Sequence, residues 1–134
     1  MTTNPIVTLT GVTKTYRQGA LDVRALRGLD LSIQKGEFTA ISGPSGSGKT
    51  TALNLIGALD KPTSGDVFLE DQNLAKLGRR TLSHLRRDRI GFVFQAYNLI
   101  PVLTAFENAE TILALQGVGA KEREQTVMDL LEKV

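Results

Sequence analysis

Residues 43–50 read GPSGSGKT, and the types and spacing of these residues suit a loop that binds phosphate. The glycines at 43, 46 and 48 lack a Cβ, so the backbone can wrap around an anion and point its N–H groups inward. Lys49 supplies a charge for the β- and γ-phosphates, and the hydroxyl of Thr50 suits Mg²⁺. The segment therefore predicts a site for a nucleoside triphosphate with Mg²⁺.

The elements around this loop are those that such a site needs. Residues 38–43 (FTAISG) are mostly apolar and predict a buried strand, and residues 51–59 (TALNLIGAL) predict a buried helix. A dinucleotide-binding turn is the rival interpretation, but Thr51 stands where its third glycine belongs. Strand, loop and helix in this order indicate a P-loop protein and leave its class open among small-molecule kinases, G proteins, RecA-like ATPases and transporter ATPases.

The remaining chain predicts strands first and helices later. Alternation of apolar and polar residues indicates half-exposed strands, followed by a basic helix, a core strand that ends on Gln95, and two helices. The spacing of Thr104 and Glu107 is that of a capping box. The predicted elements are strands at 6–16, 28–34, 66–70 and 90–95, a loop at 17–22, and helices at 79–89, from 104, and from 121.

Composition sets further bounds on the kind of protein. Among 134 residues, 41% are hydrophobic and 22% charged, the formal charge is +2 and there is no cysteine. This balance excludes disulfides and thiolate metal sites and does not indicate a nucleic-acid-binding protein. No apolar run is long enough to span a bilayer, so we expect any membrane link to come through a partner. Helical spacing continues to Val134, which suggests a chain that is cut short.

Four stretches in order carry a resemblance to a known family. They are Tyr16, RALRGLDLSIQKGEFTAISGPSGSGKTT at 24–51, LDKPTSGDVFLE at 59–70 and IGFVFQAYNLIPVLTAFENAE at 90–110. Together they resemble the ATP-binding subunit of an ABC transporter, most closely the lipoprotein-release and macrolide-export type. The resemblance implies an α/β fold: a P-loop NTPase core with an antiparallel β-subdomain at 1–96, and the Q-loop and start of a helical subdomain at 97–134.

The resemblance also implies roles for individual residues. Tyr16 would stack on adenine, although a packing role for this strand-end tyrosine is the alternative. Gln95 would reach the Mg²⁺ or the attacking water, with a solvent-facing amide as its alternative. Lys49 would act with Gln95 in catalysis, Thr50 and Gln95 would ligate Mg²⁺, and ATP would be held by Tyr16 and by Gly43, Pro44, Ser45, Gly46, Ser47, Gly48, Lys49, Thr50 and Thr51.

Partners and activity follow from the same resemblance. The loop after Gln95 would contact a transmembrane permease subunit, a second ATP-binding subunit would complete a dimer, and the protein would lie on the cytoplasmic face of the membrane. The LSGGQ-type signature, the Walker B strand and the switch histidine do not occur in the 134 residues, so we expect the N-terminal half of an ATPase domain. Two alternatives are a nucleotide-binding fragment without turnover and a P-loop kinase.

Three other features are interpreted without a catalytic role. The arginines of 79–89 predict a solvated helix face rather than a nucleic-acid site. His84, the only histidine, falls in that helix and predicts an exposed side chain. Residues 66–70 followed by Asp71 imitate an acidic Mg²⁺-binding strand end, but the apolar run is too short and predicts an outer strand.

Overall fold

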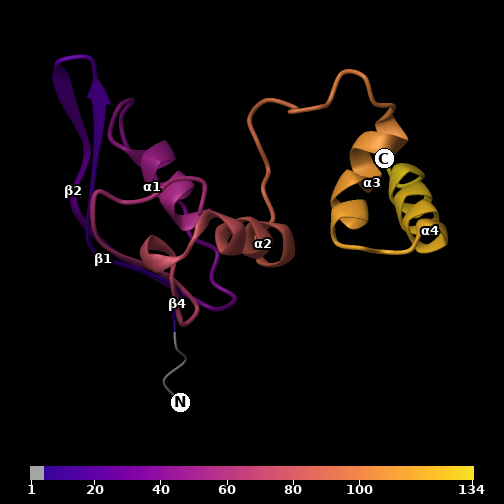
Figure 1. Ribbon diagram of the computed structural model, residues 1–134, viewed down its shortest axis with the longest axis horizontal. Helices are drawn as coiled ribbons and strands as arrows, with labels where there is room; N and C mark the ends of the chain where they lie inside the picture. The colour runs from indigo at the N-terminus through magenta and orange to yellow at the C-terminus, as the bar shows by residue number, and fades with distance from the viewer. Residues whose placement is uncertain (1–4) are drawn as a thin grey trace. The chain divides into compact units, whose positions relative to one another are not determined.

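The first part of the chain is built on an antiparallel sheet. The computed structural model describes residues 5–134, and these residues divide into two compact units between Leu82 and Ser83. The first unit contains a four-stranded sheet in the order β2-β1-β3-β4 (Figure 1). Its strands are β1 (Pro5–Gln18), β2 (Leu21–Gln34), β3 (Ser64–Leu69) and β4 (Gln72–Asn73).

The long hairpin of β1 and β2 differs from the prediction at its tip. The two predicted strands are confirmed, but the loop expected at 17–22 is a tight turn, because Gln18 already pairs with Leu21. Gly19 adopts φ 63°, a left-handed conformation that glycine reaches without a steric penalty. The strands therefore extend into residues that composition alone assigned to a loop.

One helix and the sheet form the core of the first unit. Helix α1 (Lys49–Ile56) packs against β2 and β3, and the short 3₁₀ helix η1 (Leu74–Lys76) packs against β3. The buried apolar side chains come from both layers and include Leu9, Val12, Ala52, Leu55, Val67 and Leu74. The helix predicted at 51–59 is thus confirmed with shifted bounds, and it is buried on one side only, because Leu53 is 55% exposed.

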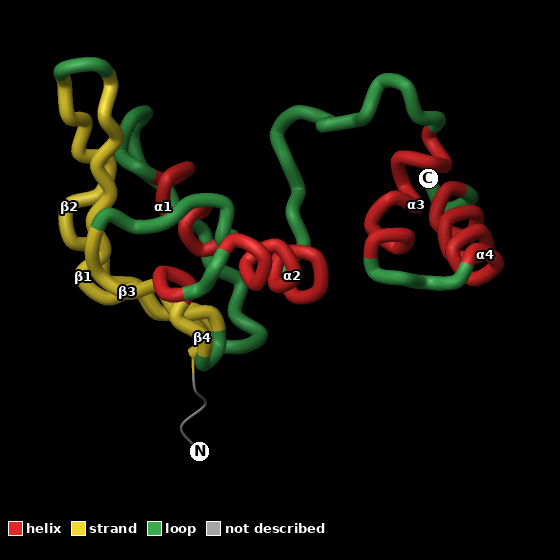
Figure 2. The backbone as a smooth tube through the Cα atoms, in the orientation of Figure 1, coloured by secondary structure: helices red, strands yellow, loops and turns green. Residues whose placement is uncertain are grey.

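Two predicted core strands do not form as strands. Residues 38–43 and 90–95 have no strand assignment (Figure 2), and Phe38 is 98% exposed. A strand needs a neighbour to receive its backbone hydrogen bonds. No strand within residues 5–134 pairs with either segment. Apolar side chains of both segments, such as Phe38 and Val93, are therefore exposed.

The second unit is helical. Helix α2 (Arg79–Arg89) crosses the division between the units and confirms the predicted basic helix, and α3 (Ala105–Leu115) and α4 (Ala120–Leu131) confirm the other two. Helices α3 and α4 pack on each other, and Val127 is buried at 1% exposure. The capping box at Thr104 and Glu107 is present as predicted. The subdomain boundary predicted after residue 96 stays a prediction.

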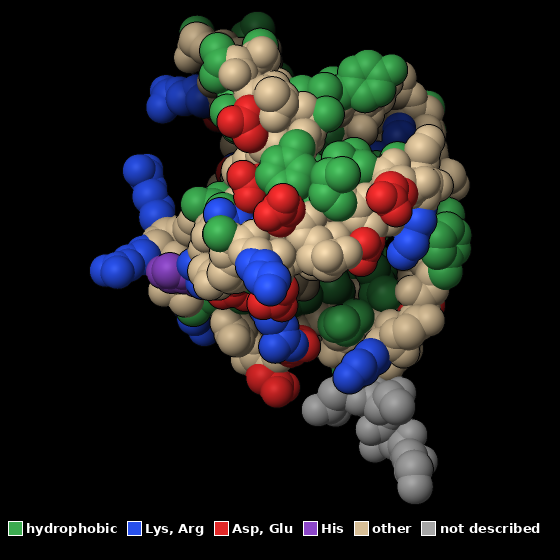
Figure 3. Space-filling model, turned by 90° about the vertical axis from the view of Figure 1, so that its right-hand side faces the viewer, with side chains coloured by type: hydrophobic (Ala, Val, Ile, Leu, Met, Phe, Trp, Pro, Cys, Tyr) green, Lys and Arg blue, Asp and Glu red, His purple; other side chains and the backbone are tan. Residues whose placement is uncertain are grey.

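Charged side chains lie exposed around the only histidine. His84 of α2 is exposed, as predicted, and Figure 3 shows it in purple with blue lysine and arginine side chains nearby. Arg87 of the same helix pairs with Asp88 at 2.6 Å, and its hydrogen bond lowers the pKa of the Asp88 carboxyl. No helix in the described part of the chain is long and apolar enough to cross a membrane.

Candidate functional site

Glycine is required in the 43–50 loop by close contacts as well as by backbone conformation. Gly46 and Gly48 have φ of 80° and 91°. A Cβ on Gly48 would lie 2.6 Å from the carbonyl oxygen of Ala25 and 2.9 Å from Leu26 Cδ2, and a Cβ on Gly43 would lie 2.8 Å from Ser47 Oγ. The loop therefore curls tightly on itself and lies directly on β2.

Lys49 closes the loop. Its ammonium donates to the carbonyl oxygen of Gly43 at 2.9 Å, to that of Pro44 at 2.7 Å and to Ser47 Oγ at 3.3 Å. The backbone N–H of Ser47 donates to the Pro44 carbonyl at 3.2 Å. A positive charge is thus held among the loop's own oxygens, where a phosphate would be attracted to it.

The loop passes directly into helix α1. Gly48 is the N-cap, it makes no side-chain capping bond, and its carbonyl accepts from the N–H of Ala52 at 2.9 Å. The first N–H groups of a helix have no partners within the helix, and the helix dipole adds positive potential at this end. Backbone amides, helix dipole and the Lys49 ammonium therefore all favour an anion at the same loop.

A pocket of about 550 Å³ lies between the loop and β2. This volume is in the range of small-molecule sites. The strand contributes Val23, Arg24 and Ala25, and the loop contributes Ser45, Gly46, Gly48, Lys49, Thr50 and Thr51. Gly43 and Pro44 serve instead as acceptors for Lys49, and Ser47 lines a neighbouring pocket of about 430 Å³.

The donor set of this pocket fits a magnesium-bound triphosphate. Two cationic residues (Arg24 and Lys49), hydroxyls and a glycine-rich backbone line the pocket, and carboxylates do not occur among the residues that line it. Within residues 5–134 no group of three or more histidine, cysteine, aspartate or glutamate side chains could hold a metal alone. A magnesium ion would therefore depend on phosphate oxygens as well as on the Thr50 hydroxyl.

Tyr16 lies on β1, next to a strand that lines the pocket. It pairs in register with Val23 of β2, one of the lining residues. The Tyr16 hydroxyl lies 3.0 Å from Asp60 Oδ2, and the Lys14 ammonium lies 4.8 Å from the centre of the ring. The stacking of Tyr16 on a base stays a prediction, but its ring is held by contacts that sequence reasoning missed.

Asp60 is the residue that joins these contacts. Burial opposes its ionised form, but hydrogen bonds from Lys14, from the Lys61 backbone N–H and from Tyr16 outweigh burial, and the pKa of Asp60 is lowered. Lys14 and Tyr16 have the spacing that places both side chains on one face of a strand. That spacing is a signal in the sequence, but nothing local indicates that Asp60 is their partner.

Gln95 belongs to the second unit, whereas the phosphate loop belongs to the first. Its side chain is exposed, and the rings of Phe92 and Phe94 stack just before it with centroids 5.5 Å apart. Further along, the Asn108 side chain accepts from the N–H of Ile100 at 2.8 Å and fixes the end of this loop. A role for Gln95 at the phosphates stays a prediction.

Comparison with known proteins shows which family this chain resembles. The chain is 46% identical over 129 residues to an ABC transporter ATP-binding protein of Thermotoga maritima. The aligned region covers 96% of the chain and 55% of that protein. The chain is also 44% identical over 131 residues to the macrolide export ATP-binding/permease protein MacB of Marinobacter nauticus. That aligned region covers 98% of the chain and 20% of MacB. The chain thus spans about half the length of the first of these relatives.

A solved structure is similar to this chain in fold. The dimeric, post-hydrolysis structure of the ATP-binding cassette MJ0796, the Methanocaldococcus jannaschii ABC transporter ATP-binding protein, contains ADP and Pi. It matches with a TM-score of 0.87 at 47% identity over 94% of the chain and 56% of the matched structure. The family described as ABC transporter matches residues 26–134. The chain therefore belongs to the ABC transporter family.

Proposed function

We propose that residues 43–51 hold the triphosphate of ATP and that Tyr16 holds its base. The observation that carries this proposal is the position of Lys49, whose ammonium is bound by the Gly43 and Pro44 carbonyls inside a loop that opens into a pocket. The ammonium would exchange these carbonyl oxygens for phosphate oxygens, and charge-assisted hydrogen bonds are stronger than neutral ones. Binding would therefore begin from a loop whose curvature is already set.

Each remaining loop residue has a proposed part. The backbone N–H groups of Ser45 to Thr51 would donate to phosphate oxygens, with that of Ser47 leaving its bond to the Pro44 carbonyl. The Thr50 hydroxyl and the Gln95 amide oxygen would be ligands of Mg²⁺. The metal would supply neutralisation of the charge on the β- and γ-phosphates. Gln95 has no charge, so it can respond to the metal without holding it tightly.

The whole protein would use this binding to drive transport. The named relatives include macrolide and pyoverdine export ATP-binding/permease proteins, and MJ0796 is a dimer. By analogy, residues 96–101 after Gln95 would contact a transmembrane permease, a second ATP-binding subunit would complete the site, and the assembly would hydrolyse ATP at the cytoplasmic face of the membrane. The cargo would then be selected by the permease rather than by these residues.

Binding without efficient turnover is the proposed behaviour of these 134 residues alone. Hydrolysis requires a group that orients water and charge that stabilises the transition state. The residues that line the pocket include no carboxylate, and the signature, Walker B and switch-histidine motifs do not occur in the sequence. ATP would therefore be bound here and turned over only when the missing groups are supplied.

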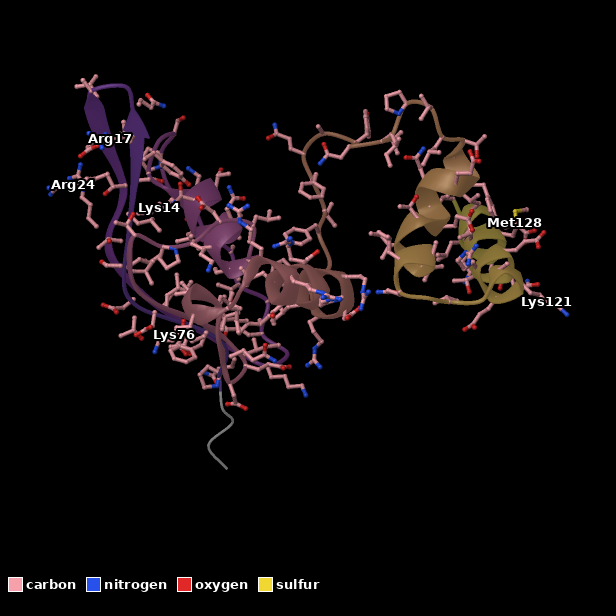
Figure 4. The ribbon with its side chains drawn as sticks, viewed as in Figure 1. Lys14, Arg17, Arg24, Lys76, Lys121 and Met128 are labelled. Atoms are coloured by element: carbon pink, nitrogen blue, oxygen red, sulfur yellow. The ribbon has the colours of Figure 1, made fainter. Side chains whose placement is uncertain are left out.

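The test is calorimetric binding of Mg-ATP to the chain and to Lys49→Ala. Loss of a charge-assisted contact worth about 1.5–3 kcal/mol predicts an affinity that falls roughly 10- to 150-fold. Lys76→Ala, which removes an exposed lysine of η1 (Figure 4), is the matched control and should bind as the parent does. Equal affinity of the parent and Lys49→Ala for Mg-ATP would contradict the proposal that the loop binds phosphate.

A further inference from the structure

Two charged residues, Lys14 and Asp60, contact the Tyr16 side chain. Lys14 donates to Asp60 Oδ1 at 2.7 Å and to the Lys61 carbonyl at 2.7 Å. The Tyr16 hydroxyl donates to the other carboxylate oxygen of Asp60 at 3.0 Å. Figure 4 shows Lys14 on β1, on the side toward α1. The two carboxylate oxygens of Asp60 therefore accept hydrogen bonds from two side chains, Lys14 and Tyr16, on the same face of β1.

The backbone that carries Asp60 is fixed by helix α1. The N–H groups of Leu59 and Asp60 both donate to the carbonyl of Asn54, at 2.8 and 3.3 Å. Ala58 adopts φ 56°, a left-handed conformation that is costly for alanine and turns the chain sharply after the helix. The position of Asp60 is thus determined by the end of the same helix that begins at Lys49.

The following residues are fixed by β1. The N–H of Thr63 donates to the Thr13 carbonyl at 2.9 Å, and the N–H of Thr15 donates to Thr63 Oγ1 at 2.9 Å. The segment around Asp60 is therefore bound on one side by the helix and on the other by the strand that carries Tyr16. Its carboxylate has little freedom to follow the tyrosine if the ring moves.

Burial strengthens the contacts within the cluster. The side chains of Lys14 and Asp60 are only 12% and 32% exposed. A partly buried ion pair is screened less by water and salt than a surface pair, and loss of one partner leaves the other charge without compensation. The Lys14 ammonium also lies over the Tyr16 ring. The ring is held at its hydroxyl and by its face, and a flat ligand could stack only on the opposite face.

We propose that Asp60, acting with Lys14, is a positioning residue that orients the Tyr16 ring for the base of the nucleotide. This inference rests on the proposed function. A ring that is already oriented loses less conformational entropy when a base stacks on it, so the base binds more tightly. Helix α1 joins the two halves of the site, because the phosphate loop includes its first residue and Asp60 follows its end.

The test compares two ligands that share a triphosphate group and of which only one carries a nucleoside. Mg-ATP and Mg-tripolyphosphate are titrated into the full chain by calorimetry. Stacking of a base on an aromatic side chain is worth about 1–3 kcal/mol, so Tyr16→Ala should lower ATP affinity roughly 5- to 150-fold and leave tripolyphosphate affinity unchanged. Asp60→Ala should lower ATP affinity about 5- to 10-fold, again without changing tripolyphosphate affinity.

Two further variants separate positioning from general destabilisation. Tyr16→Phe keeps the ring and the Lys14–Asp60 pair but removes the hydroxyl, and we expect about a 2- to 3-fold loss of ATP affinity alone. The double variant of Asp60→Ala and Tyr16→Ala should bind ATP no more weakly than Tyr16→Ala. Asp66→Ala removes a carboxylate of the same unit that accepts from Asn73 instead, and it is the control that should leave the ratio of the two affinities unchanged.

The results that overturn the inference differ from those that overturn the proposed function. If Asp60→Ala and Tyr16→Phe leave ATP affinity unchanged, or lower both affinities equally, Asp60 does not position the ring. If the parent chain binds tripolyphosphate as tightly as ATP, the base-binding part of the proposed function fails and this inference fails with it. If neither ligand binds, the phosphate loop itself has been assigned wrongly.

Discussion

Two loops in this chain follow segments that read as core strands, and they differ in how they are held. The loop at 43–50 has its conformation fixed by its own lysine and by β2. The loop after Gln95 has its first hydrogen-bonded anchor at Ile100, where Asn108 binds it. Neither preceding segment forms a strand, yet the first loop brings its predicted residues together around a pocket.

The difference shows which part of a nucleotide site is encoded locally. The phosphate loop needs glycines, one lysine and a helix start, and all of these lie within eight consecutive residues of 43–50. The placement of Gln95 would need pairing between strands that are far apart in sequence. A local motif therefore forms its geometry without the full sheet, whereas a residue at the end of a core strand depends on that sheet.

Gly48→Ala should give the largest effect on the first loop. The new Cβ would lie 2.6 Å from the Ala25 carbonyl, in a residue with φ 91°. Strain of this kind costs about 1–3 kcal/mol before the clash is added, so we expect the free energy of unfolding to fall by about 3 kcal/mol and Mg-ATP binding to be lost. Urea denaturation and calorimetry measure the two effects.

Gly46→Ala is the matched control for this variant. Gly46 also has positive φ, at 80°, but its Cβ would meet no atom within 4 Å. We expect only the conformational cost of about 1 kcal/mol and weakened rather than abolished binding. An equal loss of stability in both variants would mean that the contact with β2 does not hold the loop.

Asn108→Ala should give the next largest effect, and it acts on the second loop. The Asn108 side chain accepts from the Ile100 N–H and donates to the carbonyls of Ile100, Leu103 and Thr104. Loss of this set should cost about 2 kcal/mol, because a typical net hydrogen bond is worth about 1 kcal/mol and these share one side chain. Hydrogen exchange at the Ile100 amide measures it directly.

The contrast between the loops gives the control for Asn108→Ala. The same exchange experiment should show no change at Ser47, whose N–H is bound to Pro44 in the first unit. Faster exchange at both amides would indicate general destabilisation. Unchanged exchange at Ile100 would contradict the view that Asn108 is the anchor of the loop.

The sequence predicted what is periodic or fixed by a short motif. The helices at 79–89, 105–115 and 120–131 and the capping box were foreseen with small shifts of their bounds, and both hairpin strands were foreseen, although β2 begins at Leu21 rather than at residue 28. The prediction of strands at 38–43 and 90–95 was wrong for this structure. Apolar composition indicates that a segment tends to be buried, but it does not show whether a neighbouring strand is present to pair with it. Asp60 was missed because its partners lie 44 and 46 residues away along the chain.

Thr104→Ala should have a smaller effect than Asn108→Ala. The Thr104 hydroxyl accepts from the N–H of Glu107 at 3.2 Å, and the Glu107 carboxylate accepts from the N–H of Thr104 at 2.7 Å. Loss of an N-cap costs about 1 kcal/mol. Thermal unfolding measures it, and Thr104→Ser, which keeps the hydroxyl, should retain the parent stability. If serine lowers stability as much as alanine, the cap is not the cause.

The smallest expected effect is a pH dependence of the same cap. The hydrogen bond from the Thr104 backbone N–H, followed by that from the Thr104 hydroxyl, lowers the pKa of Glu107. Because the folded pKa lies below the unfolded one, the stabilisation is fully present above the unfolded pKa and is lost as pH falls through the folded pKa. The effect should be small, because Glu107 is exposed to solvent and its interactions are screened.

Glu107→Gln separates this contribution from the other acidic groups. Glutamine keeps the capping geometry without a titrating group, so the variant should lose less stability than the parent between neutral and acidic pH. Asp60 also has a lowered pKa, through Lys14 and Tyr16 in the first unit, so a residual slope should persist in Glu107→Gln and diminish in Asp60→Asn. Identical pH profiles for the parent and Glu107→Gln would show that the second loop's cap does not titrate, and the comparison would then rest on the hydrogen bonds of Asn108 alone.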